Sequence, residues 1–446
     1  MNPKKYDVLI IGGGILGVTL SYWISTLFDA SIAIIERDND IALHETMRNT
    51  GVIHRPFYLN PVKKKIWAFS AQNSYRMWKL LAYQDNLPWK EIGTLEVAKT
   101  NEQMKNIENY GKWAVENGMM DKEFEILNSK EIHTLEHEVN GVGAIHSKTD
   151  ACVDYRAFAL SVFNRAKQKG VKLIENTKVV GISDKNEGIL KVQGKINGYV
   201  QGSAILNCSA GGALKIARSE GLGMNYSNMF FRGDYWIVAE SYANKIHRNI
   251  YTVPEHNEFP FLDPHFIIKH SGRREVGPTA TIVSSAYSYN EKYSMPIMIW
   301  KNILSPPVKP KLKLLFNREF QELASEEWKS SVSRKAMAKR LKKFIPNIGN
   351  EVVIKKGISG IRVQVIDNNG FVPEAVILKG ERSVHIINFN SPGATGSPTF
   401  SALLINRMLE KGYFDNIHAK KEESNALWKM DEVVNNAPQK VLDEIL

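Results

Sequence analysis

The hydrophobic pattern at the start of the chain predicts a strand, a helix and a second strand. Residues 6–11 (YDVLII) form an apolar run of strand length that ends at a glycine. An uncharged stretch over 15–28 has the length of a helix, and residues 31–36 (SIAIIE) form a second apolar run that ends in an acid. Continuous short apolar runs are typical of strands buried in a parallel sheet, so this order predicts a βαβ unit.

The turn between the first strand and the helix carries the residues of a dinucleotide site. The letters GGGILG contain G-x-G-x-x-G, and Glu36 follows Gly17 by 19 residues. We expect Gly12 to permit the tight turn, Gly14 to let the backbone approach a pyrophosphate, and Gly17 to let the helix pack closely on the strand. Glu36 would accept hydrogen bonds from the ribose, and the Arg37 that follows fits either NAD or FAD.

The same region is also the longest uncharged apolar run of the chain. Residues 8–28 contain no charge, and this length would suffice for a membrane span. Three adjacent glycines at 12–14 would weaken a continuous helix, and a predicted strand follows at once. We therefore expect no membrane-spanning segment here.

Ten segments spread along the chain resemble one enzyme family. They are LHETMRNTGVIHRPFY (43–58), CVDYRAFA (152–159), LNCSAGG (206–212), FRGDYW (231–236), IYTVP (250–254), FPFLDPHF (259–266), VGPTA (276–280), KFIPNI (343–348), GISGIRVQ (357–364) and NSPGATGS (390–397). Together they cover about residues 5–412 and resemble the L-2-hydroxyglutarate dehydrogenase/oxidase family, within the superfamily of FAD-dependent oxidoreductases similar to D-amino-acid oxidase.

This resemblance implies an α/β fold with a Rossmann-type FAD-binding domain. A substrate domain built on a mixed or antiparallel sheet would be interleaved with it. Ser397 and Pro398 have the residue types of an N-cap and first helical position, so we expect the last helix of the FAD domain to begin there and to stop at Gly412. The expected division gives residues 1–90, 151–215 and 351–412 to the FAD domain, 91–150 and 216–350 to the substrate domain, and 413–446 to a C-terminal helical appendage.

The resemblance also implies non-covalent FAD held by four stretches of chain. They are the fingerprint turn, the segment 46–51 beside the isoalloxazine, the glycine turn after residue 209, and the start of the last helix. N–H groups at a helix start would stabilise negative charge on the reduced flavin. The predicted cofactor-binding residues are Gly12, Gly14, Ile15, Leu16, Gly17, Glu36, Arg37, Thr46, Asn49, Thr50, Gly51, Val179, Ala210, Gly211, Gly360, Arg362, Gly393, Ala394 and Thr395.

The implied reaction oxidises a small 2-hydroxy acid, L-2-hydroxyglutarate or a relative such as malate, to the 2-oxo acid. Such a reaction needs a group that binds the carboxylate and a base for the hydroxyl proton. Arg362 lies in a G-x-R element where the superfamily has its carboxylate-binding arginine, and guanidinium matches carboxylate in a bidentate way. His54 is the candidate base and His265 its rival, because imidazole titrates near neutrality. The alternatives are an arginine paired with a structural acid and histidines that only pack.

Further polar residues in the family-like segments could bind the far end of a dicarboxylate. The predicted substrate-binding residues, besides Arg362, are Arg232, Tyr235, Tyr251, Tyr58, Arg55 and Arg48. Arg48 and Arg55 are additional cations relative to the usual family pattern, and Thr279 stands where the family has asparagine. These departures lie where the substrate is expected, so they leave the choice of 2-hydroxy acid open. For each residue the alternative is a hydrogen bond between the domains.

The competing function is an FAD-dependent oxidase of amines or amino acids from the same superfamily, acting on glycine, sarcosine or D-amino acids. The segments FRGDYW and FPFLDPHF favour the hydroxy acid. The electron acceptor stays open among a quinone, oxygen and an electron-transfer protein. No cluster of Cys and His predicts a metal site. Cys152 and Cys208 cannot form a disulfide framework, so a reducing, cytoplasmic location is expected.

Charge adds one feature that the resemblance does not explain. The 446 residues contain 58 Lys+Arg against 47 Asp+Glu, a net charge of +11, and a length of this kind predicts two to three domains. Residues 301–356 hold 14 Lys+Arg and five Asp+Glu. Leu312, Phe316, Phe320 and Leu323 predict an amphipathic helix there. We expect either a solvated helical face or a peripheral contact with the inner face of a membrane, and no nucleic-acid partner because no basic motif is interleaved with aromatics.

Overall fold

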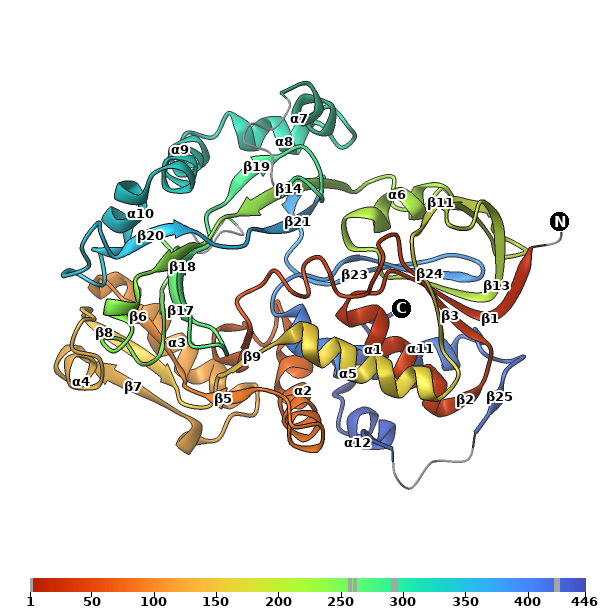
Figure 1. The fold of residues 1–446 in the computed structure, drawn as a ribbon, viewed down its shortest axis with the longest axis horizontal. Coiled ribbons are helices and arrows are strands. Elements are labelled where there is room, and N and C mark those ends of the chain that lie inside the picture. Colours follow the sequence, from red (N-terminus) through yellow and green to blue (C-terminus); the bar gives the residue numbers. More distant parts are fainter. Residues whose placement is uncertain (1–2, 256–258, 260–262, 290–295, 421–425) are drawn as a thin grey trace.

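The computed structural model describes residues 3–255, 259, 263–289, 296–420 and 426–446 (Figure 1). Its first sheet is built from the apolar runs at the start of the chain and from strands far along it. The central strand β1 (Lys4–Ile11) pairs in parallel with β3 (Ile32–Ile35) and β13 (Gly198–Asn207). The sheet is extended by β10 (Lys172–Ile174), β24 (Ser383–Asn388), β23 (Val376–Lys379), β11 (Thr177–Asp184) and β12 (Ile189–Gly194).

A layer of helices buries the apolar side of this sheet. The helix α1 (Ile15–Leu27) contacts α5 (Tyr155–Gln168) and α11 (Gly393–Glu410), and α11 packs against α2 (Lys65–Gln84). Nearly every residue of α1 is buried, which explains why its sequence has no charged face. The predicted βαβ unit therefore forms, and the uncharged run serves as a core helix. In the described part of the chain, no helix is long and apolar enough to cross a membrane.

The helix α11 differs from its sequence-based prediction. It begins at Gly393, so Ser397 and Pro398 lie inside it rather than at its start. Proline is tolerated near a helix start because the first N–H groups lack intrahelical partners, although Pro398 lies beyond that first turn. The predicted end is confirmed, since Lys411 is the C-cap and Gly412 has a φ of +79°.

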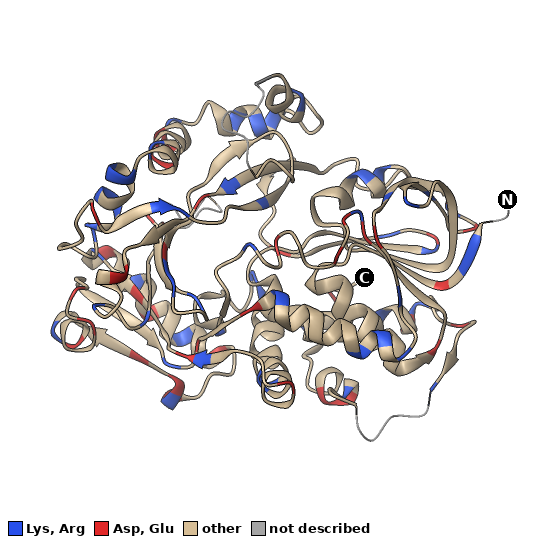
Figure 2. Ribbon diagram, viewed as in Figure 1, with Lys and Arg blue, Asp and Glu red and all other residues tan. Residues whose placement is uncertain are grey.

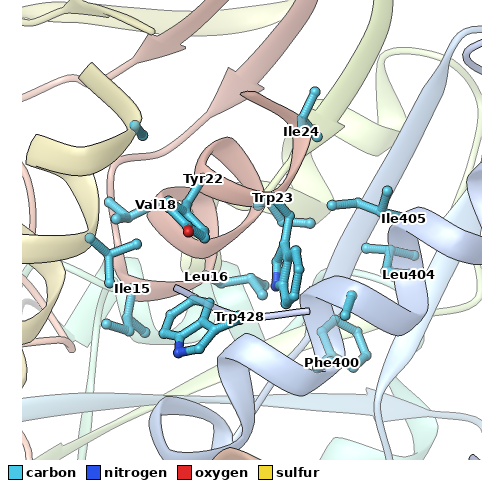
Figure 3. Packing of buried hydrophobic residues seen from close by; sticks show 14 of the residues in the cluster. Ile15, Leu16, Val18, Tyr22, Trp23, Ile24, Phe400, Leu404, Ile405 and Trp428 are labelled. Atoms are coloured by element: carbon cyan, nitrogen blue, oxygen red, sulfur yellow. The ribbon is translucent and has the colours of Figure 1, made fainter. Parts of the chain in front are cut away.

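The last residues of the chain complete the core of this first domain. We expected 413–446 to be a helical appendage, but the segment holds only the short helices α12 (Met430–Val434) and α13 (Gln439–Leu442) among its described residues. Trp428 is buried, with its ring centroid 5.2 Å from that of Tyr22 and 5.8 Å from that of Trp23 (Figure 3). Burial of this indole is why the segment packs on α1 and α11 instead of extending into solvent.

A second, mixed sheet forms the other half of the molecule (Figure 1). Its strands, in spatial order, are β20 (Val353–Lys356), β15 (Trp236–Val238), β18 (Arg274–Gly277), β17 (His265–Ile268), β16 (Asn249–Thr252), β6 (Thr94–Ala98), β8 (Gly143–Ser147) and β7 (Phe124–Asn128). Only β16 and β6 pair in parallel. Because its strands come from both sides of α5 in sequence, the two sheets are interleaved along the chain. The predicted residue boundaries between domains stay a prediction.

A smaller sheet places the predicted carboxylate-binding arginine. The strand β21 (Gly360–Asp367) pairs with β14 (Ser227–Gly233), and Phe231 lies opposite Arg362. The first residue of β21 is a glycine, and a Cβ at this position would lie only 2.5 Å from the carbonyl oxygen of Arg48. The strand that carries Arg362 therefore begins directly against the predicted flavin segment.

The basic region folds as several helices along one outer edge (Figures 1 and 2). The prediction of a single amphipathic helix from Leu312 to Leu323 is wrong. The chain forms α8 (Lys309–Leu315) and α9 (Arg318–Val332), with Asn317 capping α9 through its side chain. The break leaves Phe320 and Leu323 buried and Phe316 exposed. The helices α7 (Pro296–Ile303) and α10 (Arg334–Leu341) flank this pair.

Candidate functional site

The glycine turn after β1 has the geometry that a dinucleotide requires. Gly12 has a φ of +103°, and a Cβ on Gly17 would lie 2.0 Å from the carbonyl oxygen of Gly12. The helix α1 can therefore approach the turn only because residue 17 is glycine. Its N-cap Gly14 has no side-chain cap, and no acid lies in the first turn. This end of α1, with Ile15 and Leu16, is suited to bind a pyrophosphate.

Glu36 lies beside this turn, at the end of β3. Its carboxylate accepts hydrogen bonds from the N–H of Gly13 at 2.7 Å and from that of Asp38 at 3.0 Å. Burial raises the pKa of Glu36. Arg37 turns its guanidinium onto the ring of Tyr287, 3.7 Å from the centroid. Val179 is a buried residue of β11, the strand whose first N–H donates to the carbonyl of Glu36. The acid and the turn are therefore adjacent, an arrangement suited to bind the adenosine half of FAD.

The segment predicted to contact the isoalloxazine runs from the start of α1 toward the second sheet. Thr46 accepts a hydrogen bond from the N–H of Ile15 at 3.0 Å, and Asn49 accepts one from the N–H of Gly51 at 2.9 Å. Gly51 has a φ of +73°, where glycine avoids the steric cost of a side chain. Thr50 lies between Asn49 and Gly51. A cavity of about 340 Å³ borders this segment, with Lys269 and neighbouring residues among its lining.

Two further stretches complete the predicted FAD contacts. Ala210 has a φ of +47°, and Gly211 has no room for a Cβ because that atom would lie 2.3 Å from the Cβ of Ala286. Gly393, Ala394 and Thr395 form the first turn of α11. The residues present fit FAD, because glycines leave space along the whole path and uncapped helix starts face it.

A pair of glycine variants tests this reading of the turn. A Cβ on Gly14 would meet nothing closer than the Thr46 hydroxyl at 3.6 Å, whereas one on Gly17 would collide with Gly12. We expect Gly14→Ala to preserve the melting temperature of the apoprotein but to weaken FAD binding about tenfold or more, or about 1.4 kcal/mol, because the backbone can no longer approach the pyrophosphate. Gly17→Ala should lower both the melting temperature of the apoprotein and its affinity for FAD. Titration of apoprotein with FAD and thermal melts of the apoprotein measure the two effects. Unchanged FAD affinity in Gly14→Ala would contradict the proposed phosphate position.

His54 lies at the junction between this segment and the second sheet. It follows β4 (Val52–Ile53), its N–H donates to the Thr395 hydroxyl at 3.3 Å, and its side chain is mostly buried. Its Nδ1 lies 3.3 Å from an Asp150 carboxylate oxygen. The rings of Tyr58 and Tyr251 approach its ring edge-on, with centroids at 5.9 and 5.6 Å. The first turn of α11 thus binds the backbone of His54, while its imidazole lies against Asp150 and the two tyrosines.

Tyr58 lies near both Arg362 and His54. Burial lowers the pKa of Arg362 to about 10, and the nearby hydroxyls of Tyr58 and Tyr235 oppose this shift. The guanidinium is therefore charged at neutral pH. The same burial raises the pKa of both tyrosines, so they are neutral donors there. A partly buried cation with two phenol groups near it is suited to bind a small carboxylate, and Tyr58 also contacts an imidazole that could accept a proton from a neighbouring hydroxyl.

His265 lies one layer further from this cluster. Its ring stacks on Tyr251, with centroids 3.9 Å apart, and it is only 1% exposed. Burial holds the pKa of His265 well below its usual value, with the neighbouring His54 and Arg340 adding to the shift. A histidine that resists protonation this strongly is a poor proton acceptor. Of the two predicted bases, His54 is the better placed.

Three of the predicted substrate-binding arginines are held by other groups. Arg55 forms a buried bidentate ion pair with Glu123, at 2.9 Å for both nitrogens. Arg232 donates to Asp234 at 3.0 and 3.3 Å. Arg48 donates to the carbonyls of residues 43 and 359, and its guanidinium lies 4.2 Å from the ring centroid of Tyr289. Arg55 and Arg232 are thus already paired with carboxylates, and such pairs are costly to separate. That the three arginines bind substrate stays a prediction.

Two acids of the site had no role in the sequence-based prediction. Asp150 is fully buried next to His54, and Glu96 on β6 is nearly so. Burial and the nearby charge of Asp150 raise the pKa of Glu96 to about 8. Glu96 interrupts the apolar run Leu95–Ala98, and a charged residue within a buried strand could have indicated a functional acid. Asp150 lies in a polar stretch without any comparable signal.

The pKa of Glu96 gives a prediction about stability. The native state binds this proton more tightly than the unfolded chain does, so the free energy of unfolding should fall as pH rises from about 4.5 to about 8. Glu96→Gln removes this loss, and we expect it to raise the unfolding free energy by about 1–3 kcal/mol at pH 8 and by little at pH 5. Denaturant unfolding at the two pH values measures it, with the exposed Glu108→Gln as control. A gain that is equal at both pH values would contradict the assignment.

Comparison with known proteins agrees with this geometry. A family model described as FAD dependent oxidoreductase matches residues 7–407. An L-2-hydroxyglutarate dehydrogenase of Indibacter alkaliphilus is 27% identical over 402 residues, which cover 88% of this chain and 96% of the relative. The L-2-hydroxyglutarate dehydrogenase of Escherichia coli K12 is 25% identical, and the alignment covers 90% of this chain and 93% of the relative. The mitochondrial protein of that name from Homo sapiens is also 25% identical, and the alignment covers 92% of this chain and 90% of the relative.

Solved structures show the same fold. L-alpha-glycerophosphate oxidase from Mycoplasma pneumoniae, with FAD bound, superposes with a TM-score of 0.72 at 19% identity and covers 95% of this chain and 98% of its own. Glycine oxidase from Geobacillus kaustophilus superposes with a TM-score of 0.66 at 16% identity and covers 92% and 95%. The fold class, the cofactor and the resemblance predicted from the sequence are confirmed: the chain belongs to the family of FAD-dependent oxidoreductases.

Proposed function

We propose that the protein is an FAD-dependent dehydrogenase of a small 2-hydroxy acid, L-2-hydroxyglutarate or a close relative such as malate. The relatives named L-2-hydroxyglutarate dehydrogenase, which align over most of both chains, support this substrate class. The observation that carries the proposal is the position of Tyr58, which contacts the ring of His54 and neighbours the guanidinium of Arg362. A carboxylate on Arg362 would place the adjacent hydroxyl within the same small cluster as His54.

Each residue of the cluster has a defined task in this proposal. Arg362 binds the carboxylate next to the reacting carbon, and the hydroxyls of Tyr58 and Tyr235 donate hydrogen bonds to the bound acid. When bound, FAD supplies the acceptor for the hydride. His54 takes the hydroxyl proton on Nε2, so the substrate loses a hydride and a proton and becomes the 2-oxo acid. The buried surroundings strengthen the attraction between Arg362 and the carboxylate.

Anaerobic reduction of the purified protein by a panel of acids tests the proposal. L-2-hydroxyglutarate or malate should bleach the flavin, and glycine, sarcosine and D-amino acids should not. Bleaching by amines without bleaching by any hydroxy acid would overturn the proposal in favour of an amine or amino-acid oxidase. The fold allows for that outcome, because glycine oxidase shares it.

We propose further that the enzyme docks on the cytoplasmic face of a membrane and passes electrons to a quinone. Apolar side chains on and after α7 and α8 are exposed, among them Ile297 at 79%, Trp300 at 53% and Phe316 at 78%. Lys301, Lys309 and Lys313 are close to them in sequence, at the start of the basic region 301–356, and Figure 2 shows Lys and Arg positions on these helices. Exposed apolar groups amid positive charge are typical of surfaces that bind anionic lipid.

Vesicle sedimentation tests the docking surface. The protein should sediment with vesicles that contain anionic lipid and stay in the supernatant with zwitterionic ones. A variant with Ile297→Ser, Trp300→Ser and Phe316→Ser should lose this binding and keep its FAD. Tyr83→Ser, a change at an exposed aromatic residue of α2, serves as the control and should bind like the wild type. Equal sedimentation of the wild type and the triple variant would rule this surface out.

A further inference from the structure

A buried carboxylate lies directly behind the proposed base. Asp150 is in the connection between β8 and β9 (Ala151–Val153), and none of its surface is exposed. An isolated buried carboxylate is strongly unfavourable unless hydrogen bonds satisfy its oxygens. The partners of Asp150 therefore decide what it does.

Three groups donate to the two oxygens of Asp150, and the imidazole of His54 lies against one of these oxygens. Its Oδ1 accepts from the hydroxyl of Ser147 and from the backbone N–H of Arg55, the latter at 3.2 Å. Its Oδ2 accepts from the hydroxyl of Thr94 at 2.9 Å and lies 3.3 Å from Nδ1 of His54. Ser147 and Thr94 lie opposite each other on β8 and β6, so the sheet itself positions two of the donors. Because these three groups donate, Asp150 acts as a hydrogen-bond acceptor at this site.

An acceptor at Nδ1 determines which imidazole nitrogen carries the proton. The neutral ring has one N–H, and the Asp150 oxygen can only accept, so the proton lies on Nδ1 and the lone pair on Nε2. We propose that Asp150 is a positioning residue that acts through His54: it fixes this tautomer and stabilises the imidazolium that forms when Nε2 takes the substrate proton. This inference rests on the proposed function of His54.

The other groups around the ring do not compete with Asp150 for Nδ1. Tyr58 on the short 3-10 helix Pro56–Tyr58 and Tyr251 on β16 approach the ring edge-on and are neutral. His265 on β17 stacks on the far side of Tyr251. Glu96 on β6 adds a second acid near Asp150, and it is protonated below about pH 8. Asp150 is thus the carboxylate that contacts Nδ1 and can stabilise a protonated His54.

The substrate-independent test is nitrogen NMR of the FAD-loaded protein labelled with ¹⁵N-histidine. The resonances of His54 are identified by their absence in His54→Gln. We expect a protonated Nδ1 and an unprotonated Nε2 in the neutral ring of the wild type. A proton on Nε2 instead would overturn the proposal, whatever the substrate of the enzyme is.

The kinetic test uses Asp150→Asn and follows anaerobic flavin reduction by the 2-hydroxy acid that reduces the wild type. We expect the limiting rate to fall about 10- to 100-fold and the dissociation constant of the acid to change less than about threefold. The acid limb of the rate–pH profile should move to lower pH, because the imidazolium loses its carboxylate partner. Ser147→Ala removes one donor to Asp150 but keeps its contact with His54, and should change the rate much less.

A double-mutant cycle separates this role from general damage to the site. In the His54→Gln background, Asp150→Asn should cause no further loss of rate, since its effect runs through the imidazole. An equal loss in both backgrounds, or an acid limb that does not move, would overturn the proposal. Failure of every hydroxy acid to reduce the wild type would instead refute the proposed function, and the NMR result would still decide the tautomer.

Discussion

Replacing Arg362 by alanine is expected to lower the ratio of the limiting rate of flavin reduction to the dissociation constant of the 2-hydroxy acid by about 100- to 1,000-fold, or about 3–4 kcal/mol. Arg362 lies on β21, is partly buried and is charged at neutral pH, and Tyr58 and Tyr235 cannot supply its charge. Without the cation, the bound carboxylate would be desolvated with no compensating ion pair. Most of the loss should therefore appear in substrate affinity.

Stopped-flow reduction under anaerobic conditions measures this loss. Arg362→Lys keeps the charge but not the planar fork, so it should fall between the wild type and the alanine variant. In the wild type, affinity for the acid should decline as pH rises through about 10, where the guanidinium would lose its proton. FAD content serves as the control because Arg362 is also a predicted flavin neighbour. Full affinity for the hydroxy acid in Arg362→Ala, with FAD bound, would remove it from the carboxylate site.

Replacing His54 by glutamine is expected to lower the limiting rate of flavin reduction by about 100- to 10,000-fold, the usual contribution of a positioned base. Glutamine can keep a hydrogen bond to Asp150 but cannot accept a proton near neutral pH. The substrate carboxylate is bound by a different residue, so the dissociation constant should change little. This separation of rate from affinity distinguishes His54 from Arg362.

His265→Gln is the matched comparison for His54. Both residues are buried histidines in contact with Tyr251, but His265 lies behind that ring. We expect His265→Gln to retain most of the limiting rate, as measured in the same stopped-flow experiment. If His265→Gln lowers the limiting rate more than His54→Gln does, His265 and not His54 is the base.

The sequence allowed the first domain to be predicted well because its signals are local. A glycine turn, an apolar strand on each side and an acid at Glu36 lie within 36 residues, and each is required by the backbone path. The roles of His54 and Arg362 were predicted from the motifs around them and stay predictions. That Tyr58 neighbours both residues could not be predicted, because β21, which carries Arg362, is positioned by its pairing with β14.

Side-chain partners could not be predicted where the pairing depends on the folded chain. Arg55 forms its ion pair with Glu123, which lies 68 residues away, and no local pattern connects the two residues. Arg232 pairs with Asp234, which is only two residues away, but the sequence does not indicate whether the two side chains contact each other. Asp150 was missed because its role depends on the sheet that brings Thr94 and Ser147 to its oxygens.

Helix boundaries failed for a similar reason. Pro398 suggested a helix start, but the helix begins at Gly393, where Thr395 accepts hydrogen bonds from the His54 N–H and contacts the Tyr155 hydroxyl. Trp428 belongs to the core although no pattern near it predicts a partner. In each case a tertiary contact outweighed the local preference.

A single-turnover reaction tests the central claim most directly. The FAD-loaded protein is mixed anaerobically with L-2-hydroxyglutarate or malate, and the flavin spectrum and the 2-oxo acid formed are measured together. We predict full bleaching and one 2-oxo acid per flavin, with Arg362→Ala and His54→Gln both far slower. A flavin that stays oxidised with both hydroxy acids, while glycine or sarcosine reduces it, would contradict the account.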